Sequence, residues 1–171
     1  MDIFDLSRYK YFNKDNRYIL AAIDVFSRKA FAIPLINKDG HIVKEAFIKM
    51  TKLVKPRCII SDHDAAFLSN EFSSYLDNLQ IPLNVNALGD HHVLGIIDNF
   101  AKRIKTILTA MFLKNNNTRW FHVLENIINH YNRSENEALN GLSPDEACRD
   151  ANKPKVLDIN LEKNKKIGYL I

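Results

Sequence analysis

The strongest constraint on the fold is a run of apolar residues near the start of the chain. Tyr18-Ile-Leu-Ala-Ala-Ile-Asp-Val-Phe26 is interrupted only by Asp24. A continuous apolar run of this length is typical of a strand that is buried on both faces. Ser27-Arg28 then predicts a tight turn into a second strand over residues 30–36. The sequence therefore places a buried sheet at the centre of the fold.

Later segments alternate between strand-like and helix-like patterns. Apolar runs and helical periodicity predict strands at 3–6, 58–60 and 81–88, and helices at 41–54, 70–79, 95–114 and 118–132. Residues 10–17 predict a polar turn after the first strand. With strands first and helices between the later strands, the order predicts an α/β fold, a mixed five-stranded sheet with helices on both faces. The chain length of 171 residues suits one domain, which we expect over residues 1–150.

The last part of the chain holds one well-specified helix start and a polar tail. Ser143 is a good N-cap, Pro144 suits the first helical position, and Glu146 completes a capping box. Residues 153–166 are polar and include five lysines. We therefore expect residues 151–171 to form a tail or linker toward an absent module.

Composition excludes several classes of protein. Apolar residues make up 46% and charged residues 26%, the balance of a globular protein with a core. No apolar run approaches the roughly 18 residues of a membrane helix, and we expect neither a membrane partner nor a secretory signal. Cys58 and Cys148 cannot form a disulfide framework or a zinc site. The net charge of +4 permits a polyanionic partner without requiring one.

Two aspartates accompany predicted strands. Asp62 directly follows the strand at 58–60, and the carboxyl ends of strands are where α/β folds bind ligands. Its ordinary interpretation is that Asp62 or Asp64 simply begins a turn. Asp2 lies in the first predicted strand, where Asp is disfavoured, and its ordinary interpretation is an exposed terminus.

A third aspartate lies on the longest predicted helix. At about 100° per residue, Asp98, Lys102 and Lys105 fall within roughly 60° of one another, opposite the apolar side chains. Taken alone, this face is better explained by a solvated surface with an i,i+4 ion pair. Taken together, carboxylates from a first strand, a later strand end and a helix suit a pair of hard divalent cations. Two such ions can promote in-line displacement at phosphorus, and nearby lysines would meet phosphates.

At this point the sequence resembles a known family, the catalytic core of retroviral-type integrases and related DDE transposases, most of all the integrases of Maverick/Polinton elements and virophages. The resemblance extends from Asp2 to about Cys148. Its matching stretches are Asp2-Ile-Phe-Asp-Leu6, Tyr18–Arg28, Ile60-Ser-Asp-His-Asp-Ala-Ala-Phe67, Leu94–Lys105, Trp120 with Tyr131-Asn132, and Leu142-Ser-Pro-Asp-Glu-Ala147.

The resemblance implies an RNase H-like fold and a specific activity. It implies that Asp2, Asp62 and Asp98 bind two Mg²⁺ or Mn²⁺ ions; as in the family, 35 residues separate the last two ligands. It further implies 3′-end processing of element DNA by water, followed by strand transfer to target DNA by the freed 3′-hydroxyl. Lys102 and Lys105 match positions that contact element DNA. A homo-oligomer, and an intracellular location in the host nucleus of a eukaryote, are expected on the same grounds.

Three departures from the family pattern are visible. Asp98 stands where Glu is usual, although mariner-type transposases also use Asp. His63-Asp64 replaces a frequent Asn-Gly, so Asp64 is either an accessory or a decoy carboxylate. The first strand normally begins further from the start than Asp2 does, which suggests an excised core.

Two alternatives to an active integrase core stay open. One is an RNase H-like module that binds DNA or self-associates but no longer catalyses. The other is a hydrolytic nuclease of the same fold. His91-His92 are expected in a loop near DNA or solvent, and Trp120, Phe121, Leu124, Ile127 and Ile128 are expected in the core, with some facing a dimer partner if the family pattern holds.

Overall fold

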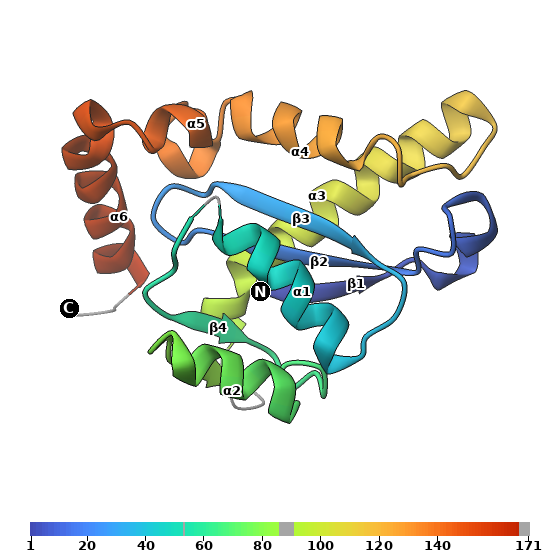
Figure 1. The fold of residues 1–171 in the computed structure, drawn as a ribbon. Coiled ribbons are helices and arrows are strands. Elements are labelled where there is room, and N and C mark those ends of the chain that lie inside the picture. Colours follow the sequence, from blue (N-terminus) through green and yellow to red (C-terminus); the bar gives the residue numbers. More distant parts are fainter. Residues whose placement is uncertain (53, 86–90, 168–171) are drawn as a thin grey trace. The chain divides into compact units, whose positions relative to one another are not determined.

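Strands and helices alternate along the chain in the computed structural model, which describes residues 1–52, 54–85 and 91–167 (Figure 1). The described residues contain five strands: β1 (Asp2–Asp5), β2 (Tyr18–Ile23), β3 (Ala30–Leu35), β4 (Ile59–Ser61) and β5 (Leu83–Val85). The chain divides into two compact units. The first comprises Met1–Ala22 with Phe31–Glu125, and the second comprises Ile23–Ala30 with the chain from Asn126 onward.

The strands form a three-stranded sheet and a parallel pair. The first sheet has the order β1-β2-β3, and β1 runs antiparallel to β2 with Asp2 opposite Ala21. In the second, β4 and β5 are parallel. The Met1 amino group donates a hydrogen bond to the Ile60 carbonyl oxygen at 2.7 Å, so β4 lies beside the start of β1. The expected mixture of antiparallel and parallel strands is confirmed.

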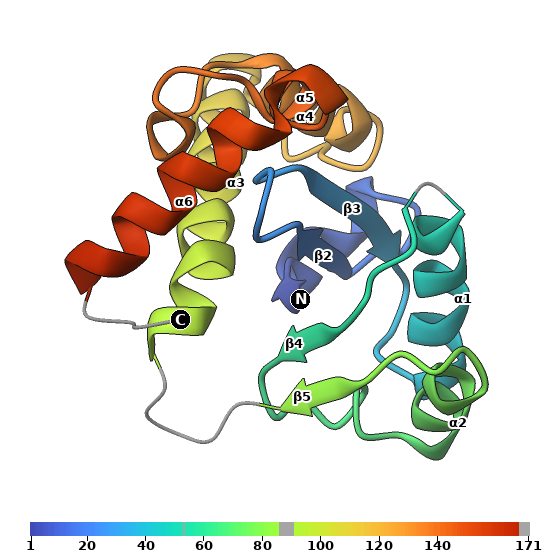
Figure 2. The ribbon, with the colours of Figure 1, turned by 90° about the vertical axis from the view of Figure 1, so that its left-hand side faces the viewer.

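Helices cover both faces of the sheet in the first unit. Strand residues alternate in direction, so Ile3 and Phe4 point to opposite faces. Ile3 belongs to the core formed with α1 (Gly40–Thr51) and α2 (Asn70–Asn78). The Phe4 ring lies 6.2 Å from that of Phe100 on α3 (His91–Asn115). Figure 2 shows α1 and α2 on one side of β1–β3 and α3 on the other. The α/β expectation is therefore confirmed.

The core on the side of α1 and α2 explains why the sheet and these helices form together. Phe47 and Phe72 make an edge-to-face contact with ring centroids 5.4 Å apart. Ser69 accepts a hydrogen bond from the Phe72 amide and thereby caps α2. Other fully or nearly fully buried members are Leu20, Leu35, Val43, Ala46, Met50, Ile59, Phe67 and Leu76. These residues hold β4, and hence its carboxyl end, against the sheet.

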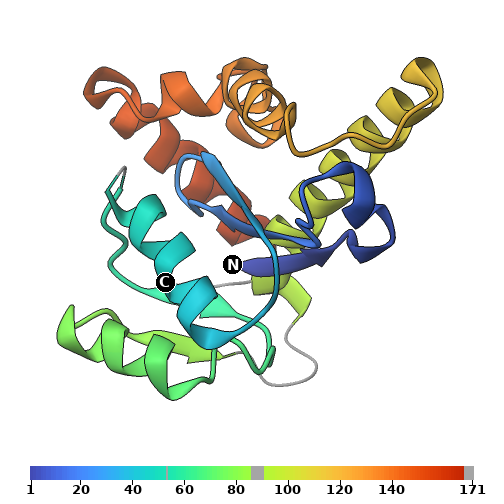
Figure 3. The same ribbon diagram turned by 45° about the vertical axis from the view of Figure 1, so that its right-hand side comes forward.

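The connection from β1 to β2 is more ordered than the polar turn predicted over 10–17. It contains a 3-10 helix, η1 (Ser7–Phe12), followed by the fully buried Asn13. The Asn13 side chain donates to the Tyr9 and Thr118 carbonyl oxygens at 2.7 and 2.9 Å. It also accepts from the amides of Trp120 and Phe121 at 2.7 and 2.9 Å. η1 therefore lies at the C-terminal end of α3, as the dark blue segment in Figure 3 shows.

The second unit contains α4 (Leu124–Arg133) from Asn126 onward, then η2 (Glu137–Leu139), α5 (Pro144–Ala147), η3 (Asp150–Asn152) and α6 (Lys153–Ile167). The capping box predicted at Ser143 and Glu146 is confirmed, with both reciprocal hydrogen bonds present. The buried Asn132 side chain donates to the Ala30 carbonyl and accepts from the Ala30 amide, both at 2.9 Å. This unit thus has its own polar and apolar contacts.

Several local predictions differ from the structure. Residues 118–123 precede α4 instead of belonging to it, because Asn13 donates to the Thr118 carbonyl oxygen that a helix beginning there would use as its first acceptor. His91 and His92 lie in α3, not in a loop. The stretch at 153–166 is helical, and Val156 is buried with Leu139 and Ala147. That residues 151–171 lead to a further module stays a prediction. Part of the strand predicted at 81–88 lies outside the described residues.

Within the described ranges, no helix combines the length and the apolar character that a membrane crossing requires. The set of residues expected in the core is largely confirmed. Trp120, Leu124, Ile127 and Ile128 are buried, and Phe121 is half-buried.

Candidate active site

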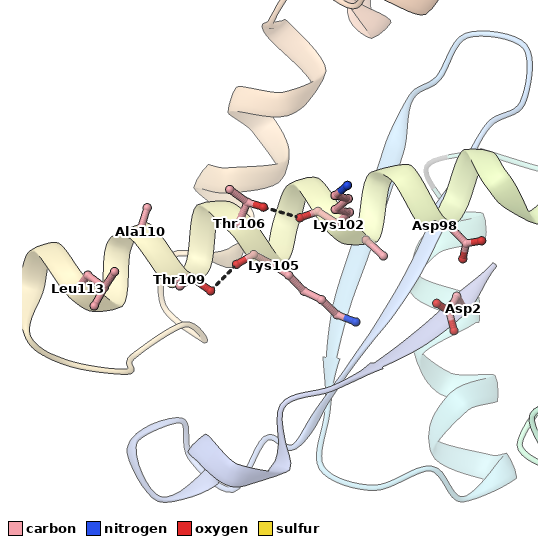
Figure 4. A pocket seen from close by; sticks show the side chains of 9 residues that line it. Asp2, Asp98, Lys102, Lys105, Thr106, Thr109, Ala110 and Leu113 are labelled. Atoms are coloured by element: carbon pink, nitrogen blue, oxygen red, sulfur yellow. Dashed lines mark hydrogen bonds between the residues drawn. The ribbon is translucent and has the colours of Figure 1, made fainter.

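The three aspartates lie on three different elements of the first unit. Asp2 opens β1, Asp62 directly follows β4, and Asp98 lies in the first half of α3. Asp2 lies on the same face of β1 as Phe4, because side chains two apart on a strand share a face. Phe4 contacts Phe100 of α3, so this alternation directs Asp2 toward the helix that carries Asp98. Figure 4 shows the Asp2 and Asp98 carboxylates facing the same space.

The electrostatics of Asp2 connect all three carboxylates. Burial raises the pKa of Asp2, and the charges of Asp62 and Asp98 raise it further. A hydrogen bond of 2.6 Å from the Ile3 amide and the charge of the Met1 ammonium group act in the opposite direction. Because the interaction between two charges falls with the distance between them, Asp62 and Asp98 are close enough to Asp2 to affect its pKa. Asp2 is thus repelled by both of the other carboxylates.

The Met1 ammonium group also interacts with two of these carboxylates. Burial lowers its pKa, while the charges of Asp2 and Asp62 work to raise it. Its hydrogen bond to the Ile60 carbonyl oxygen places it at the junction of β1 and β4. At this position burial outweighs the attraction of the two carboxylates, so the charged form of the Met1 amino group is disfavoured overall.

The three aspartates are the kind of ligand that binds hard cations, although their carboxylates are not close enough together to share one ion as they stand. Aspartate oxygens from β1, the end of β4 and α3 are the ligands that Mg²⁺ and Mn²⁺ prefer. In the part of the chain that the structure describes, no three His, Cys, Asp or Glu side chains are close enough to hold a metal ion as they stand. Like charges repel one another, so a bound cation would favour a closer approach of these carboxylates.

Asp64 is engaged by other groups. Its Oδ2 lies 2.5 Å from the Lys38 ammonium nitrogen, and its Oδ1 accepts from the Ala66 amide at 3.0 Å. Burial works to lower the pKa of Lys38, but the hydrogen bond and charge of Asp64 outweigh it and raise that pKa. The Asp64 amide also donates weakly to Asp62 Oδ1, at 3.4 Å. Asp64 therefore fixes the loop that carries Asp62.

One face of α3 continues from Asp98 as a strip of exposed polar side chains. Asp98, Lys102 and Lys105 are all exposed, and Ile97, Phe100 and Ile104 are buried, as the helical periodicity predicts. An open pocket of about 700 Å³ runs along this face (Figure 4). It is lined by Asp2, Asp98, Ala101, Lys102, Lys105, Thr106, Thr109, Ala110 and Leu113.

Lys105 and the threonines are held in place by nearby groups. The Lys105 ammonium lies 5.6 Å from the centre of the Phe4 ring, a cation–π contact that joins α3 to β1. Thr106 and Thr109 donate hydrogen bonds to the carbonyl oxygens of Lys102 and Lys105. The pocket thus joins two carboxylates to two positive charges along one helix, an arrangement that suits a phosphodiester chain near a metal site.

The sequence analysis missed Thr106, Thr109 and Leu113 as pocket residues. The signal that could have found them is the helical period of Asp98, Lys102 and Lys105, since it continues to Thr109 and Leu113 on the same face. The sequence also gives no sign that the aromatic residues of η1 are functional, because Lys10–Arg17 predicts only a polar turn.

Comparisons with known proteins agree with this fold. No protein-family model matches the chain. It is 28% identical over 157 residues to an uncharacterized transposon-derived protein of Caenorhabditis elegans, and the match covers 90% of this chain and 54% of that protein. The chain thus spans about half the length of that curated relative.

Among solved structures, the chain is similar to the HTLV-2 integrase catalytic core domain in complex with magnesium. The dimeric form aligns with a TM-score of 0.63 and 18% identity, covering 76% of this chain and 82% of that one. The trimeric form aligns with a TM-score of 0.61 and 22% identity, covering 77% and 84%. The fold is therefore that of integrase catalytic cores, which is RNase H-like, as expected.

Proposed function

We propose that this chain is the catalytic core of an integrase of a virus or transposon, a metal-dependent polynucleotidyl transferase. The observation that carries the proposal is that three aspartates from β1, the end of β4 and α3 interact electrostatically, since the charges of Asp62 and Asp98 both raise the pKa of Asp2. The integrase-core fold and the similarity to a transposon-derived protein support it. Within this class, the motifs favour the Maverick/Polinton and virophage type.

In this proposal Asp2, Asp62 and Asp98 hold two Mg²⁺ or Mn²⁺ ions. The bound ions supply positive charge that stabilises the attacking and leaving oxygens of an in-line displacement. Cation binding replaces repulsion among the three carboxylates with attraction, so we expect it to bring them closer than they now stand. The magnesium bound by the HTLV-2 relative supports this choice of ion.

The remaining side chains position DNA. Lys102 and Lys105 contact phosphates next to the carboxylates, and Asp64 with Lys38 fixes the loop that carries Asp62. In 3′-end processing, a water oxygen bonds to phosphorus and the bond to the departing nucleotide breaks, which frees a 3′-hydroxyl. In strand transfer that hydroxyl oxygen attacks a target phosphodiester, and the broken P–O bond leaves a 3′-hydroxyl on the target. One phosphodiester replaces another, so joining needs no external energy source.

The partners are element-end DNA, target DNA and further copies of the chain. The dimeric and trimeric forms of the HTLV-2 core domain support self-association. Integration into a eukaryotic genome would place the protein inside the cell, in the host nucleus. Sedimentation of the chain with and without DNA tests the oligomer.

The experiment that tests the function uses a branched DNA that mimics the product of strand transfer. Reversal of joining at the branch, with Mn²⁺ or Mg²⁺ present, is a reaction that depends little on flanking domains. We expect metal-dependent resolution by the wild type and loss of at least about a hundredfold in rate for Asp62→Asn and for Asp98→Asn. Asp77→Asn, at an exposed position on α2, is the matched control and should react as the wild type does.

Two other results would identify the alternatives. Cleavage of linear DNA without any joined product would indicate a hydrolytic nuclease of the same fold. DNA binding with neither metal binding nor resolution would indicate a catalytically degenerate module, the second candidate, which is motivated by Asp98 in place of Glu and by His63-Asp64 in place of Asn-Gly. Full activity in both Asp62→Asn and Asp98→Asn would refute the assigned site.

A further inference from the structure

An aromatic and basic surface lies on η1 and the residues that follow it, outside the candidate active site. Tyr11 and Phe12 are 81% and 62% exposed, which makes them unusual among large apolar side chains. The Lys10 ammonium lies 5.0 Å from the centre of the Tyr11 ring, and Arg8 lies 4.4 Å from that of Tyr9. Exposed rings beside cations are the side-chain set with which proteins hold unpaired nucleic-acid bases and their phosphates.

Positive charge is concentrated in this segment. Residues 7–17 contain four basic residues and one acidic residue, so they account for three of the four net positive charges of the chain. Arg8, Lys10 and Lys14 form no ion pair with any carboxylate of the described residues. Their charge is therefore available to a polyanion, whereas an apolar face of a protein partner would gain little from it.

The segment is also fixed before any ligand binds. Asn13 joins it through four hydrogen bonds to residues 118–121 and to Tyr9. The Tyr9 ring packs edge-on against Phe112 of α3 at 4.9 Å, and Lys14 lies 5.3 Å from the Phe121 ring. Because the backbone of the segment is already ordered, binding through Tyr11 and Phe12 would cost less conformational entropy.

The position of the segment connects it to the strip on α3. Phe112, which packs against Tyr9, is next to Leu113, the residue that ends the pocket beginning at Asp2 and Asp98. From Asp98 to Leu113 the helix rises about 22 Å at 1.5 Å per residue. Duplex DNA rises 3.4 Å per base pair, so about six base pairs span the same distance.

We propose that Arg8, Lys10, Tyr11, Phe12 and Lys14 form a second DNA-contact site, in which the two exposed rings stack on unpaired bases and the cations contact phosphates. The DNA that enters the candidate active site runs along α3 and reaches this site about six base pairs away. This inference rests on the proposed function for the identity of its ligand. It assigns a separate task to η1, namely to hold the frayed or single-stranded part of a DNA end.

The test measures binding without divalent metal, so no reaction occurs. The full chain is titrated into a short duplex with a single-stranded extension that carries 2-aminopurine, and anisotropy and 2-aminopurine fluorescence are followed together. We expect Tyr11→Ala/Phe12→Ala to weaken binding at least fivefold and to abolish quenching of the 2-aminopurine, since base stacking on each ring is removed. Leu68→Ala/Leu157→Ala, at two half-exposed positions elsewhere, is the matched control.

A second variant tests the cations independently of the rings. Lys10→Gln/Lys14→Gln should flatten the dependence of log affinity on log salt by about 1.4, or about 0.7 for each single-strand phosphate that is no longer neutralised. Both variants are first checked for folding through the fluorescence of Trp120, the single tryptophan. If one variant does not fold, the other still decides the question.

Unchanged affinity and quenching in Tyr11→Ala/Phe12→Ala would overturn the proposal. So would a fall in oligomer mass by sedimentation with DNA affinity unchanged, since the surface would then bind a second copy of the chain. The outcome is independent of the integrase assignment. A chain that binds DNA through these rings but does not resolve branched DNA contradicts only the proposed function, and the reverse result contradicts only the second site.

Discussion

Replacing the buried Asn13 by alanine should be among the most destabilising single changes in this protein. The Asn13 side chain makes four hydrogen bonds of 2.7–2.9 Å, and its exposed fraction is 0%. Asn13→Ala leaves two amides and two carbonyl oxygens without these partners. An orphaned buried polar group costs about 1–3 kcal/mol, but relaxation and entry of water recover part of it. We expect the free energy of unfolding to fall by about 3–5 kcal/mol.

The chain itself supplies the assay. Trp120 is the single tryptophan, and its amide is one of the groups that Asn13 binds, so its fluorescence reports unfolding at this position. Urea titrations of the wild type and Asn13→Ala give the difference in the free energy of unfolding. The matched control is Asn129→Ala, at an exposed position of α4, which should change stability by less than about 0.5 kcal/mol.

A further variant separates the two halves of the Asn13 network. Asn13→Asp retains the acceptor for the Trp120 and Phe121 amides but loses both donors to the carbonyl oxygens. We expect its loss of stability to depend on pH, because a protonated carboxyl can again donate to one carbonyl. A loss below about 1.5 kcal/mol in Asn13→Ala would refute the reasoning, since it would mean that the network is replaced at little cost.

Three further predictions concern charge and capping. Asp2→Asn should raise the urea midpoint at neutral pH in chelator, because it removes a half-buried charge that neighbouring carboxylates repel; a lower midpoint would contradict this. Asp5→Asn on the same strand should lower the midpoint at pH 7. The 2.7 Å hydrogen bond from the Ser7 amide lowers the pKa of Asp5 in the folded protein. The stability that it contributes is therefore fully present above the pKa of Asp5 in the unfolded chain, and it is lost as the pH falls through the pKa in the folded protein. Ser143→Ala should reduce stability by about 1 kcal/mol in thermal melts, and Glu146→Gln, which keeps an acceptor, by less.

The sequence predicts those parts of the fold that follow from local periodicity. The apolar run at 18–26 gives β2, and the heptad-like spacing of Ile97, Phe100 and Ile104 gives the buried face of α3. Ser143 and Glu146 specify a helix start through bonds only three residues apart. These features depend on near neighbours, so a single sequence is sufficient to find them.

The parts that sequence reasoning missed depend on contacts between distant residues. The start of α4 depends on Asn13, more than a hundred residues away, because Asn13 donates to the Thr118 carbonyl oxygen that a longer helix would use as an acceptor. Nothing near Asn13 distinguishes it from the other polar residues of its turn. α6 has little signal in the sequence, because residues 153–166 are polar and include five lysines, and Val156 is buried by contacts with Leu139 and Ala147 outside this helix.

The same distinction between local and distant contacts applies to the residues of the candidate site. The face shared by Asp98, Lys102 and Lys105 follows from one helix and was predicted. The proximity of Asp2 and Asp62 to that face depends on the register of β1 and on the place of β4, for which the family resemblance supplied the expectation. The engagement of Asp64 by Lys38 had no signal in the sequence, since the two residues are 26 apart and on different elements.

The alternation of side chains along β1 determines what happens if β1 pairs with β2 in the wrong register. Asp2 and Phe4 point toward α3, while Ile3 enters the core under α1 and α2. Shifting β1 by one residue against β2 would turn Ile3 to the α3 side and put the Asp2 carboxylate into the apolar core. A molecule that misaligns the site therefore also loses its packing. We expect such errors to be removed as unfolded chains, so that preparations of the folded protein are uniform in the geometry of Asp2.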